Sequence, residues 1–194
     1  MYWEVPLLNL AYLLDSLVLV DDIELHLLKD RVAKHVPYVE PEDVEIKMFK
    51  HQKEAVEYGL NKDKWLLLDA PGLGKTLTII RLAEERKKRD NIQHCLIICG
   101  INNLKHNWKK EIQKFSKEQC RIIGQKITRT GKSRTVGIKE RVDELSNKLD
   151  EFFIILNIES LRDDRIVKAL TKGINKFDMI AFDEVHTAKN AGSQ

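Results

Sequence analysis

Short apolar runs alternate with amphipathic stretches along the chain after Lys47. Unbroken apolar runs at 65–69, 95–99, 121–123, 152–156 and 179–182 are typical of buried strands. Between them, apolar residues at helical spacing predict helices over 75–88, 102–115 and 160–170. Strands without polar alternation, separated by helices, indicate a parallel sheet covered on both faces. The expected fold class is therefore α/β.

Residues 1–45 follow a different pattern. Two groups of apolar residues, at 7–14 and 23–32, predict two short amphipathic helices that break near Asp21, although 18–20 also fits a strand. Residues 37–45 contain two prolines and four acidic side chains, which is typical of a linker. We expect a small, mainly helical accessory segment at 1–45, followed by one larger lobe at 46–194. The apolar run at 5–20 is interrupted by polar residues and is too short for a membrane span.

Charge divides the chain in the same place. Residues 1–45 hold 3 basic and 10 acidic side chains, whereas the rest holds 30 basic and 20 acidic ones, a balance of +10. A basic body suggests a polyanionic partner, although solvated lysines give the same count. The 43% hydrophobic and 32% charged content indicates a folded rather than a disordered chain. Three cysteines and the absence of a positively charged leader favour a soluble protein of a reducing, cytoplasmic compartment (the host cytoplasm if a phage encodes it).

The strongest chemical signal is the loop at 69–76, between the first predicted strand and its helix. Glycines allow successive N–H groups to curl around phosphate oxygens, and the helix that follows directs its positive end toward them. Lys75 would neutralise the β- and γ-phosphates of ATP, and the Thr76 hydroxyl would hold Mg²⁺. The general P-loop pattern has glycine where this chain has Asp69. The expected nucleotide contacts in this loop are Pro71, Gly72, Leu73, Gly74, Lys75, Thr76 and Leu77.

The second signal is a pair of acids, Asp183 and Glu184, at the end of the last apolar strand. In open α/β folds this edge of the sheet binds ligands. Asp183 would hold Mg²⁺ while Glu184 polarises the attacking water, because metal coordination consumes the basicity that the water needs. Lys75 and Glu184 are therefore the expected catalytic residues.

These motifs resemble those of the Swi/Snf-type ATPases of helicase superfamily 2. The segment 69–78 is similar to that family's Asp-Glu-Met-Gly-Leu-Gly-Lys-Thr motif, with Ala70 and Pro71 as departures, and Pro71 removes a backbone donor. Residues 183–186 followed by Lys189-Asn190 resemble its Asp-Glu-Ala-His motif. Further similar segments are 49–52, 99–115 and 157–161, of which the first resembles the Q motif that contacts adenine. The resemblance covers roughly 47–194.

The resemblance implies the first RecA-like lobe of an ATP-dependent motor that tracks along double-stranded DNA. It implies adenine contact by Gln52, which we favour over the alternative of a solvated helix residue. It also implies that a second lobe and one sheet strand lie outside this sequence, so that the fragment alone would have little activity and its exposed strand edges could self-associate. A DEAD- or DEAH-like helicase acting on RNA or DNA, and a module that binds nucleotide or DNA without turnover, stay open as alternatives.

Two further features are less specific. Residues 125–141 are rich in basic side chains and glycines, which predicts a flexible loop along DNA phosphates or simply a solvated loop. Its candidate DNA contacts are Lys126, Arg129, Lys132 and Arg134. Trp108 lies at helical spacing with Leu104 and Ile112, which favours core packing over ligand stacking.

Overall fold

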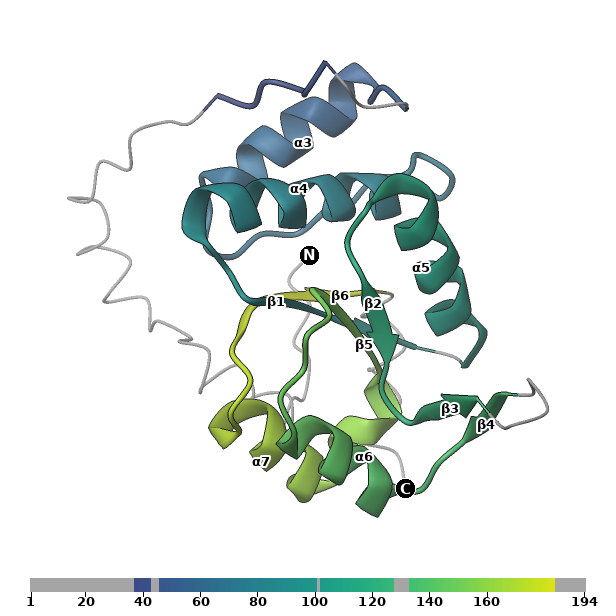
Figure 1. Cartoon of the computed structure of the whole chain (residues 1–194). Coiled ribbons are helices and arrows are strands. Elements are labelled where there is room, and N and C mark those ends of the chain that lie inside the picture. The colour runs from purple at the N-terminus through teal and green to yellow at the C-terminus, as the bar shows by residue number, and fades with distance from the viewer. Residues whose placement is uncertain (1–36, 43–45, 101, 128–132, 184–194) are drawn as a thin grey trace, which may run out of the picture. The chain divides into compact units, whose positions relative to one another are not determined.

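The computed structural model describes residues 37–42, 46–100, 102–127 and 133–183 (Figure 1). These residues form two compact units, which are described one at a time. The sheet unit comprises residues 93–110 and 118–183, and the loop unit comprises residues 37–92 and 111–117. Helix α5 (Asn102–Phe115) contributes residues to both. The helices predicted within 1–36 lie outside the described residues, and so does the predicted boundary at 45.

The sheet unit is built on four parallel strands. They are β1 (His94–Cys99), β2 (Cys120–Ile122), β5 (Phe153–Asn157) and β6 (Phe177–Phe182), in the order β2-β5-β1-β6. Every residue of β1 is buried, so both faces of this central strand are covered. The register pairs Cys99 with Asn157 and Ile98 with Phe182, which brings the carboxyl ends of β1, β5 and β6 to one edge. The parallel α/β sheet predicted from the sequence is confirmed.

Helices α6 (Ile138–Ser146) and α7 (Asp164–Lys172) lie together on one side of this sheet (Figure 1). The short 3₁₀ helix η2 (Ile158–Arg162) connects β5 to α7. Large aliphatic and aromatic side chains from the strands and from these helices form one buried cluster, because burying them removes apolar surface from water. Its members are Leu96, Ile98, Ile123, Leu145, Leu149, Ile154, Leu156, Leu161, Ile166, Ala169, Leu170 and Phe177.

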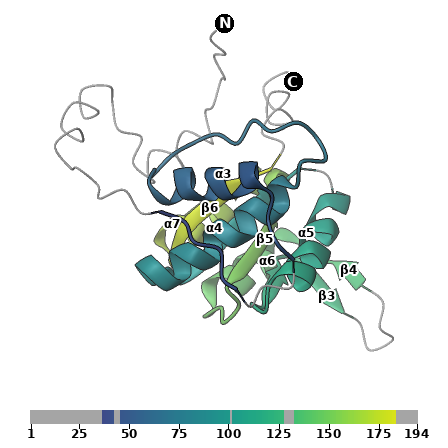
Figure 2. The same ribbon diagram turned by 90° about the horizontal axis from the view of Figure 1, so that it is seen from above.

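In the loop unit, α3 (Lys50–Leu60) packs beside α4 (Lys75–Asp90), as Figures 1 and 2 show. Val56, Ile80 and Leu82 are completely or almost completely buried and form part of the core. The Arg86 guanidinium donates to the Gly59 carbonyl oxygen at 2.9 Å, near the end of α3. The same oxygen also accepts the Lys62 N–H at 3.4 Å, and a cation at this end of α3 complements the helix dipole. Among the described residues, no helix is long and apolar enough to cross a membrane.

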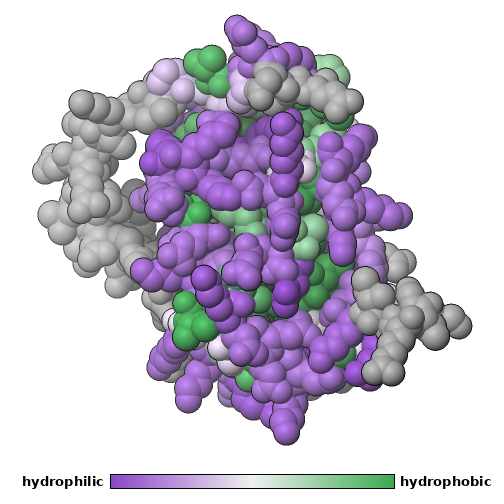
Figure 3. Space-filling model, in the orientation of Figure 1, coloured by the Kyte–Doolittle hydropathy of each residue, from purple (hydrophilic) through white to green (hydrophobic). Residues whose placement is uncertain are grey.

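The prediction of a buried strand at 65–69 is wrong. The segment pairs with no other strand in the described part of the chain, and the exposed fractions of Leu66 and Leu68 are 76% and 86%. An apolar run becomes a buried strand only when a neighbouring strand satisfies its N–H and C=O groups. The apolar composition at 65–68 therefore does not decide its structure. Elsewhere, the face of the molecule in Figure 3 is mostly hydrophilic, with hydrophobic residues in separate patches.

The prediction of a flexible loop over 125–141 is also wrong for its described residues, 125–127 and 133–141. Strands β3 (Gln125–Ile127) and β4 (Ser133–Thr135) form an antiparallel hairpin, and α6 begins at Ile138. Gly124 enters this hairpin with φ +80°, a conformation that favours glycine, and the Val136 N–H donates to its carbonyl oxygen at 2.9 Å. Strands of three residues are too short to reveal an alternating pattern, which is why the sequence did not indicate them. We call Gln125–Thr135 the basic hairpin; its residues 128–132 are not described.

Candidate nucleotide-binding site

The phosphate loop, which we define as residues 69–76, ends directly at the start of α4. Gly72 and Gly74 have φ values of +85° and +75°, which residues with a Cβ rarely adopt. The first backbone bond that closes the helix runs from the Thr78 N–H to the Gly74 carbonyl oxygen, at 3.2 Å. The N–H groups of Lys75, Thr76 and Leu77 precede it and have no acceptor within the helix. A 16-residue helix thus presents free donors and its positive end at the glycines, an arrangement that binds anions.

The Lys75 side chain folds back over the phosphate loop. Its Nζ donates to the carbonyl oxygen of Asp69 at 2.7 Å and to that of Ala70 at 3.1 Å. These partners are neutral, so a phosphate that replaced them would add a full charge pair. The Asp69 carboxylate has a buried oxygen, Oδ2, without a hydrogen-bond partner in the described part of the chain. The sequence placed Lys75 at the phosphates, and its position over the loop fits that role.

Gln52 is joined to the phosphate loop. Its side chain is only 3% exposed; its Oε1 accepts from the Phe49 N–H at 2.9 Å, and its Nε2 donates to the Leu73 carbonyl oxygen at 3.0 Å. His51 Nε2 lies 3.2 Å from the same Leu73 oxygen, and the His51 ring stacks on Phe49. The contact of His51 with the Leu73 carbonyl oxygen was not predicted from the sequence. Adenine contact by Gln52 stays a prediction, because both ends of its amide are bound to the protein's own backbone.

Asp183 lies in the sheet unit, one residue past the end of β6. Its N–H donates to the Ile98 carbonyl oxygen at 2.8 Å, which continues the pairing of β6 with β1. Its carboxylate Oδ2 accepts a hydrogen bond from Trp108 Nε1 at 2.8 Å. Trp108 is 6% exposed, so the predicted core packing is confirmed, but the bond from its indole was missed. Glu184, the expected general base, lies outside the described residues.

Burial changes the pKa of two ionisable side chains in the sheet unit, Cys99 and Lys105. Burial and, after it, the negative charge of Asp183 raise the pKa of the Cys99 thiol to about 11. Burial also lowers the pKa of Lys105, with the Arg141 charge as the next cause. Cys99 is therefore a neutral thiol at physiological pH. The carboxylate of Asp183 is the hard oxygen donor at this edge of the sheet.

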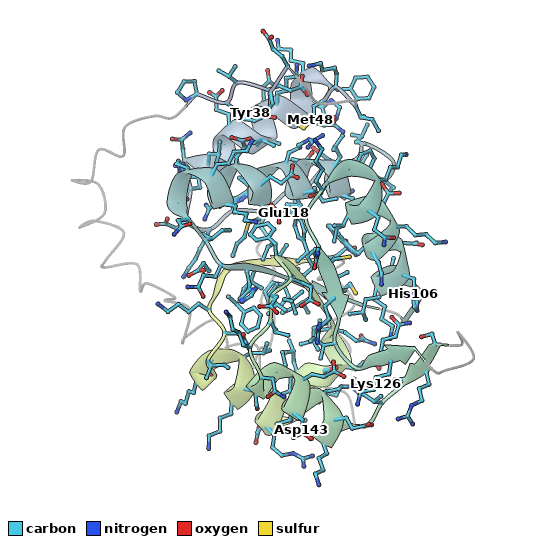
Figure 4. The ribbon with its side chains drawn as sticks, viewed as in Figure 1. Tyr38, Met48, His106, Glu118, Lys126 and Asp143 are labelled. Atoms are coloured by element: carbon cyan, nitrogen blue, oxygen red, sulfur yellow. The ribbon has the colours of Figure 1, made fainter. Side chains whose placement is uncertain are left out.

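The basic hairpin brings together the two described residues of the predicted DNA contact. Lys126 and Arg134 are paired across the hairpin, and both bind Glu140 at the start of α6, at 3.2 Å and 3.5 Å. The hydrogen bond from Lys126, followed by the charges of Lys126 and Arg134, holds the Glu140 pKa below its ordinary value. Figure 4 shows Lys126 on the hairpin and His106 on α5. The His106 Nε2 lies 3.4 Å from the Gln125 Nε2. Arg129 and Lys132 lie outside the described residues.

Many metal ions in proteins are held by clusters of His, Cys, Asp or Glu side chains. Over the described ranges, no group of three or more His, Cys, Asp or Glu side chains is placed to hold a metal ion. Mg²⁺ does not require such a group, because it is bound through one or two carboxylates together with substrate phosphates and water. The Thr76 hydroxyl in the loop unit and the Asp183 carboxylate in the sheet unit are each oxygen donors of the kind Mg²⁺ prefers, so the chemical type of each side chain fits the metal predicted from the sequence.

A parallel sheet with a carboxylate at its carboxyl edge, together with a glycine-rich loop that opens a helix, defines the P-loop class of nucleotide-binding lobes. Residues 45–193 match the family described as "Type III restriction enzyme, res subunit". The chain belongs to this family. Its fold is that of the N-terminal lobe of superfamily 2 helicase-like ATPases, as the resemblance to Swi/Snf-type ATPases implied.

One curated protein and two solved structures are similar to this chain. An "Uncharacterized ATP-dependent helicase" of Mycoplasma pneumoniae is 31% identical over 147 residues, which are 74% of this chain and 13% of that protein. The Sulfolobus solfataricus SWI2/SNF2 ATPase core in complex with dsDNA has a TM-score of 0.56 at 24% identity, over 80% of this chain and 30% of that one. A nuclease-deletion mutant of the Type ISP restriction-modification enzyme LlaGI, in complex with a DNA substrate mimic, has a TM-score of 0.55 at 20% identity, over 73% of this chain and 15% of that one. The chain thus spans less than a third of the length of each.

Proposed function

We propose that the chain is the ATP-binding lobe of a motor that uses ATP hydrolysis to move along double-stranded DNA. The observation that carries this proposal is the phosphate loop, in which Gly72 and Gly74 take left-handed conformations and Lys75 lies across the loop at the start of α4. Backbone donors, a helix N-terminus and a flexible cation are the three elements that recognise the phosphates of a nucleotide.

The roles of individual residues follow from their chemistry. Lys75 exchanges its two backbone carbonyls for the β- and γ-phosphates, while Thr76 and Asp183 hold Mg²⁺. When bound, the metal neutralises charge on the phosphates during transfer. Glu184 acts as the base that orients water. We propose that efficient hydrolysis also requires groups outside residues 1–194, which the resemblance places in a second lobe.

The proposal that the motor moves along double-stranded DNA is supported by separate observations. The basic hairpin presents Lys126 and Arg134 on the surface, and both matched structures contain DNA or a DNA mimic. Phosphate contacts by lysine and arginine supply binding that is independent of sequence and falls with salt. A motor that translocates needs this kind of contact, because it must bind equally well at each step.

The phosphate-loop proposal is tested by Lys75→Ala, with Lys88→Ala, an exposed lysine of the same helix, as the matched control. Hydrogen bonds to charged groups contribute about 1.5–3 kcal/mol, so Lys75→Ala should weaken ATP binding on the order of 10- to 100-fold. Calorimetric titration of each variant with ATP and Mg²⁺ measures the change. Equal affinity of Lys75→Ala, Lys88→Ala and the unsubstituted chain would overturn the proposal.

The choice of track is tested by turnover. ATP hydrolysis by the chain and by a longer form of the protein should rise with double-stranded DNA and not with RNA. Stimulation by RNA alone would instead support the DEAD-like alternative. Nucleotide binding without any turnover in the longer form would support the non-hydrolysing module.

A further inference from the structure

The bond between Trp108 and Asp183 joins two segments that are 75 residues apart in the sequence. Trp108 comes from the first half of α5, and Asp183 follows β6; both belong to the sheet unit. The indole is buried, and its Nε1 can only donate a hydrogen bond. The Asp183 carboxylate oxygen Oδ2 is therefore the acceptor in this contact.

Asp183 is fixed at both its backbone and its side chain. The Ile98 carbonyl oxygen holds its N–H at 2.8 Å, and Trp108 Nε1 holds Oδ2 at the same distance. No partner for the other oxygen, Oδ1, is seen within the part of the chain that the structure describes. One oxygen is thus held by a rigid aromatic group and the other is left for a ligand.

We propose that Trp108 is a positioning residue that orients Asp183 for Mg²⁺ bound with ATP. The inference rests on the proposed nucleotide site and concerns a residue that does not itself touch nucleotide or metal. A neutral donor suits this role, because a lysine or arginine in its place would repel the metal at short distance. Groups that hold a metal ligand from behind set its orientation, and their replacement typically lowers metal affinity about 10- to 100-fold.

The test separates binding that depends on Mg²⁺ from binding that does not. Trp108→Phe keeps an aromatic ring in the core and removes the N–H. Trp65→Phe is a matched control because it makes the same substitution at an indole that is not the one bonded to Asp183. ATP affinity is measured for each variant with excess Mg²⁺ and again with EDTA. We expect Trp108→Phe to lose about tenfold of the affinity with Mg²⁺. The affinity in EDTA should be unchanged, and Trp65→Phe should change neither.

A second measurement detects the bond directly. The chain has three tryptophans, so a ¹⁵N-labelled sample gives three indole N–H signals, which single Trp→Phe variants assign. Asp183→Ala should shift the Trp108 signal and leave the others in place. Addition of Mg²⁺ and ATP to the unsubstituted chain should also move this signal, and Asp183→Ala should abolish that response.

The outcomes distinguish this inference from the proposed function. If the unsubstituted chain binds no ATP in either condition, the proposed function fails, and an indole signal unaffected by Asp183→Ala then overturns the inference too. If ATP binds but Trp108→Phe lowers affinity equally with and without Mg²⁺, Trp108 is merely structural and the inference is wrong. Unchanged affinity in both conditions is equally decisive against it. A Trp108→Phe variant that fails to fold leaves the Asp183→Ala shift as the deciding result.

Discussion

Replacing Gly74 by alanine tests the geometry of the phosphate loop against a control two residues away. Gly72 and Gly74 have similar positive φ values, so an alanine at either position costs about 1–2 kcal/mol of left-handed strain. A Cβ at Gly72 would meet nothing, whereas a Cβ at Gly74 would collide with Gln52 Nε2. That collision displaces the amide from the Leu73 carbonyl oxygen and leaves a buried donor unpaired, at a further cost of about 1–3 kcal/mol. Gly74→Ala should therefore destabilise the chain by about 2–5 kcal/mol, and Gly72→Ala by about 1–2 kcal/mol.

Urea unfolding followed by circular dichroism measures the free energy of unfolding of each variant. The loss of unfolded-state entropy caused by alanine is the same at both positions and cancels in the comparison. Combining Gly74→Ala with Gln52→Ala should remove the collision and bring the additional cost of Gly74→Ala close to that of Gly72→Ala. Equal destabilisation by the two single variants would refute the contact between Gln52 and the loop.

Three further predictions concern the sheet unit. Asn175 is buried and makes hydrogen bonds to Leu145, Asn147 and Leu149, so Asn175→Ala should lower the free energy of unfolding by about 2–4 kcal/mol in urea titrations. Burial raises the pKa of the Cys99 thiol from 9.0 to about 11, so its contribution to stability, present below pH 9, should be lost as the pH rises toward 11. Thermal melts between pH 8 and 11, compared with those of Cys99→Ala, measure that loss. Glu140→Gln removes the ion pairs of Lys126 and Arg134, so it should tighten duplex DNA binding and steepen the slope of log affinity against log salt by about one. An unchanged slope would exclude the hairpin from DNA contact.

The long periodic elements could be predicted from the sequence. Helix α5 has the bounds that its apolar spacing predicted, and α4 extends only two residues beyond its predicted end. The predicted runs at 95–99, 152–156 and 179–182 fall within or overlap strands β1, β5 and β6, and in β1 and β5 the apolar residues are also the buried ones. In each case the local pattern is long enough to specify both the type of element and the face that it buries.

Two regions could not be predicted, for different reasons. The apolar run at 65–68 has the composition of a strand, but strand formation depends on a partner that the local sequence does not specify. The basic hairpin has strands of three residues, and its glycines and charges are equally typical of an irregular loop. Pairing between strands is a tertiary property in both regions.

In the candidate site, the residue types could be predicted from the sequence, whereas the contacts between distant residues could not. The phosphate loop was predictable because phosphate binding requires glycines, a lysine and a helix start in consecutive positions. The partners of Gln52 and Asp183 were not, since they come from segments 21 and 75 residues distant in the sequence. Helical spacing correctly placed Trp108 in the core, but it does not say what the indole N–H meets there.

The cations predicted to bind ATP and those predicted to bind DNA have different partners in the protein without ligand. This difference affects the free energy that each group gains when it binds a phosphate. Lys75 is held by neutral carbonyl oxygens, so a phosphate at the loop adds a charge pair that the free protein lacks. Lys126 and Arg134 already share the Glu140 carboxylate, so a DNA phosphate exchanges one anion for another. Exposed ion pairs contribute only about 0–1 kcal/mol, which makes that exchange easy but also limits its gain. Nucleotide binding at the phosphate loop should therefore be the stronger and less salt-dependent of the two, whereas we expect the basic hairpin to bind DNA weakly and reversibly, as the proposed movement along DNA would require.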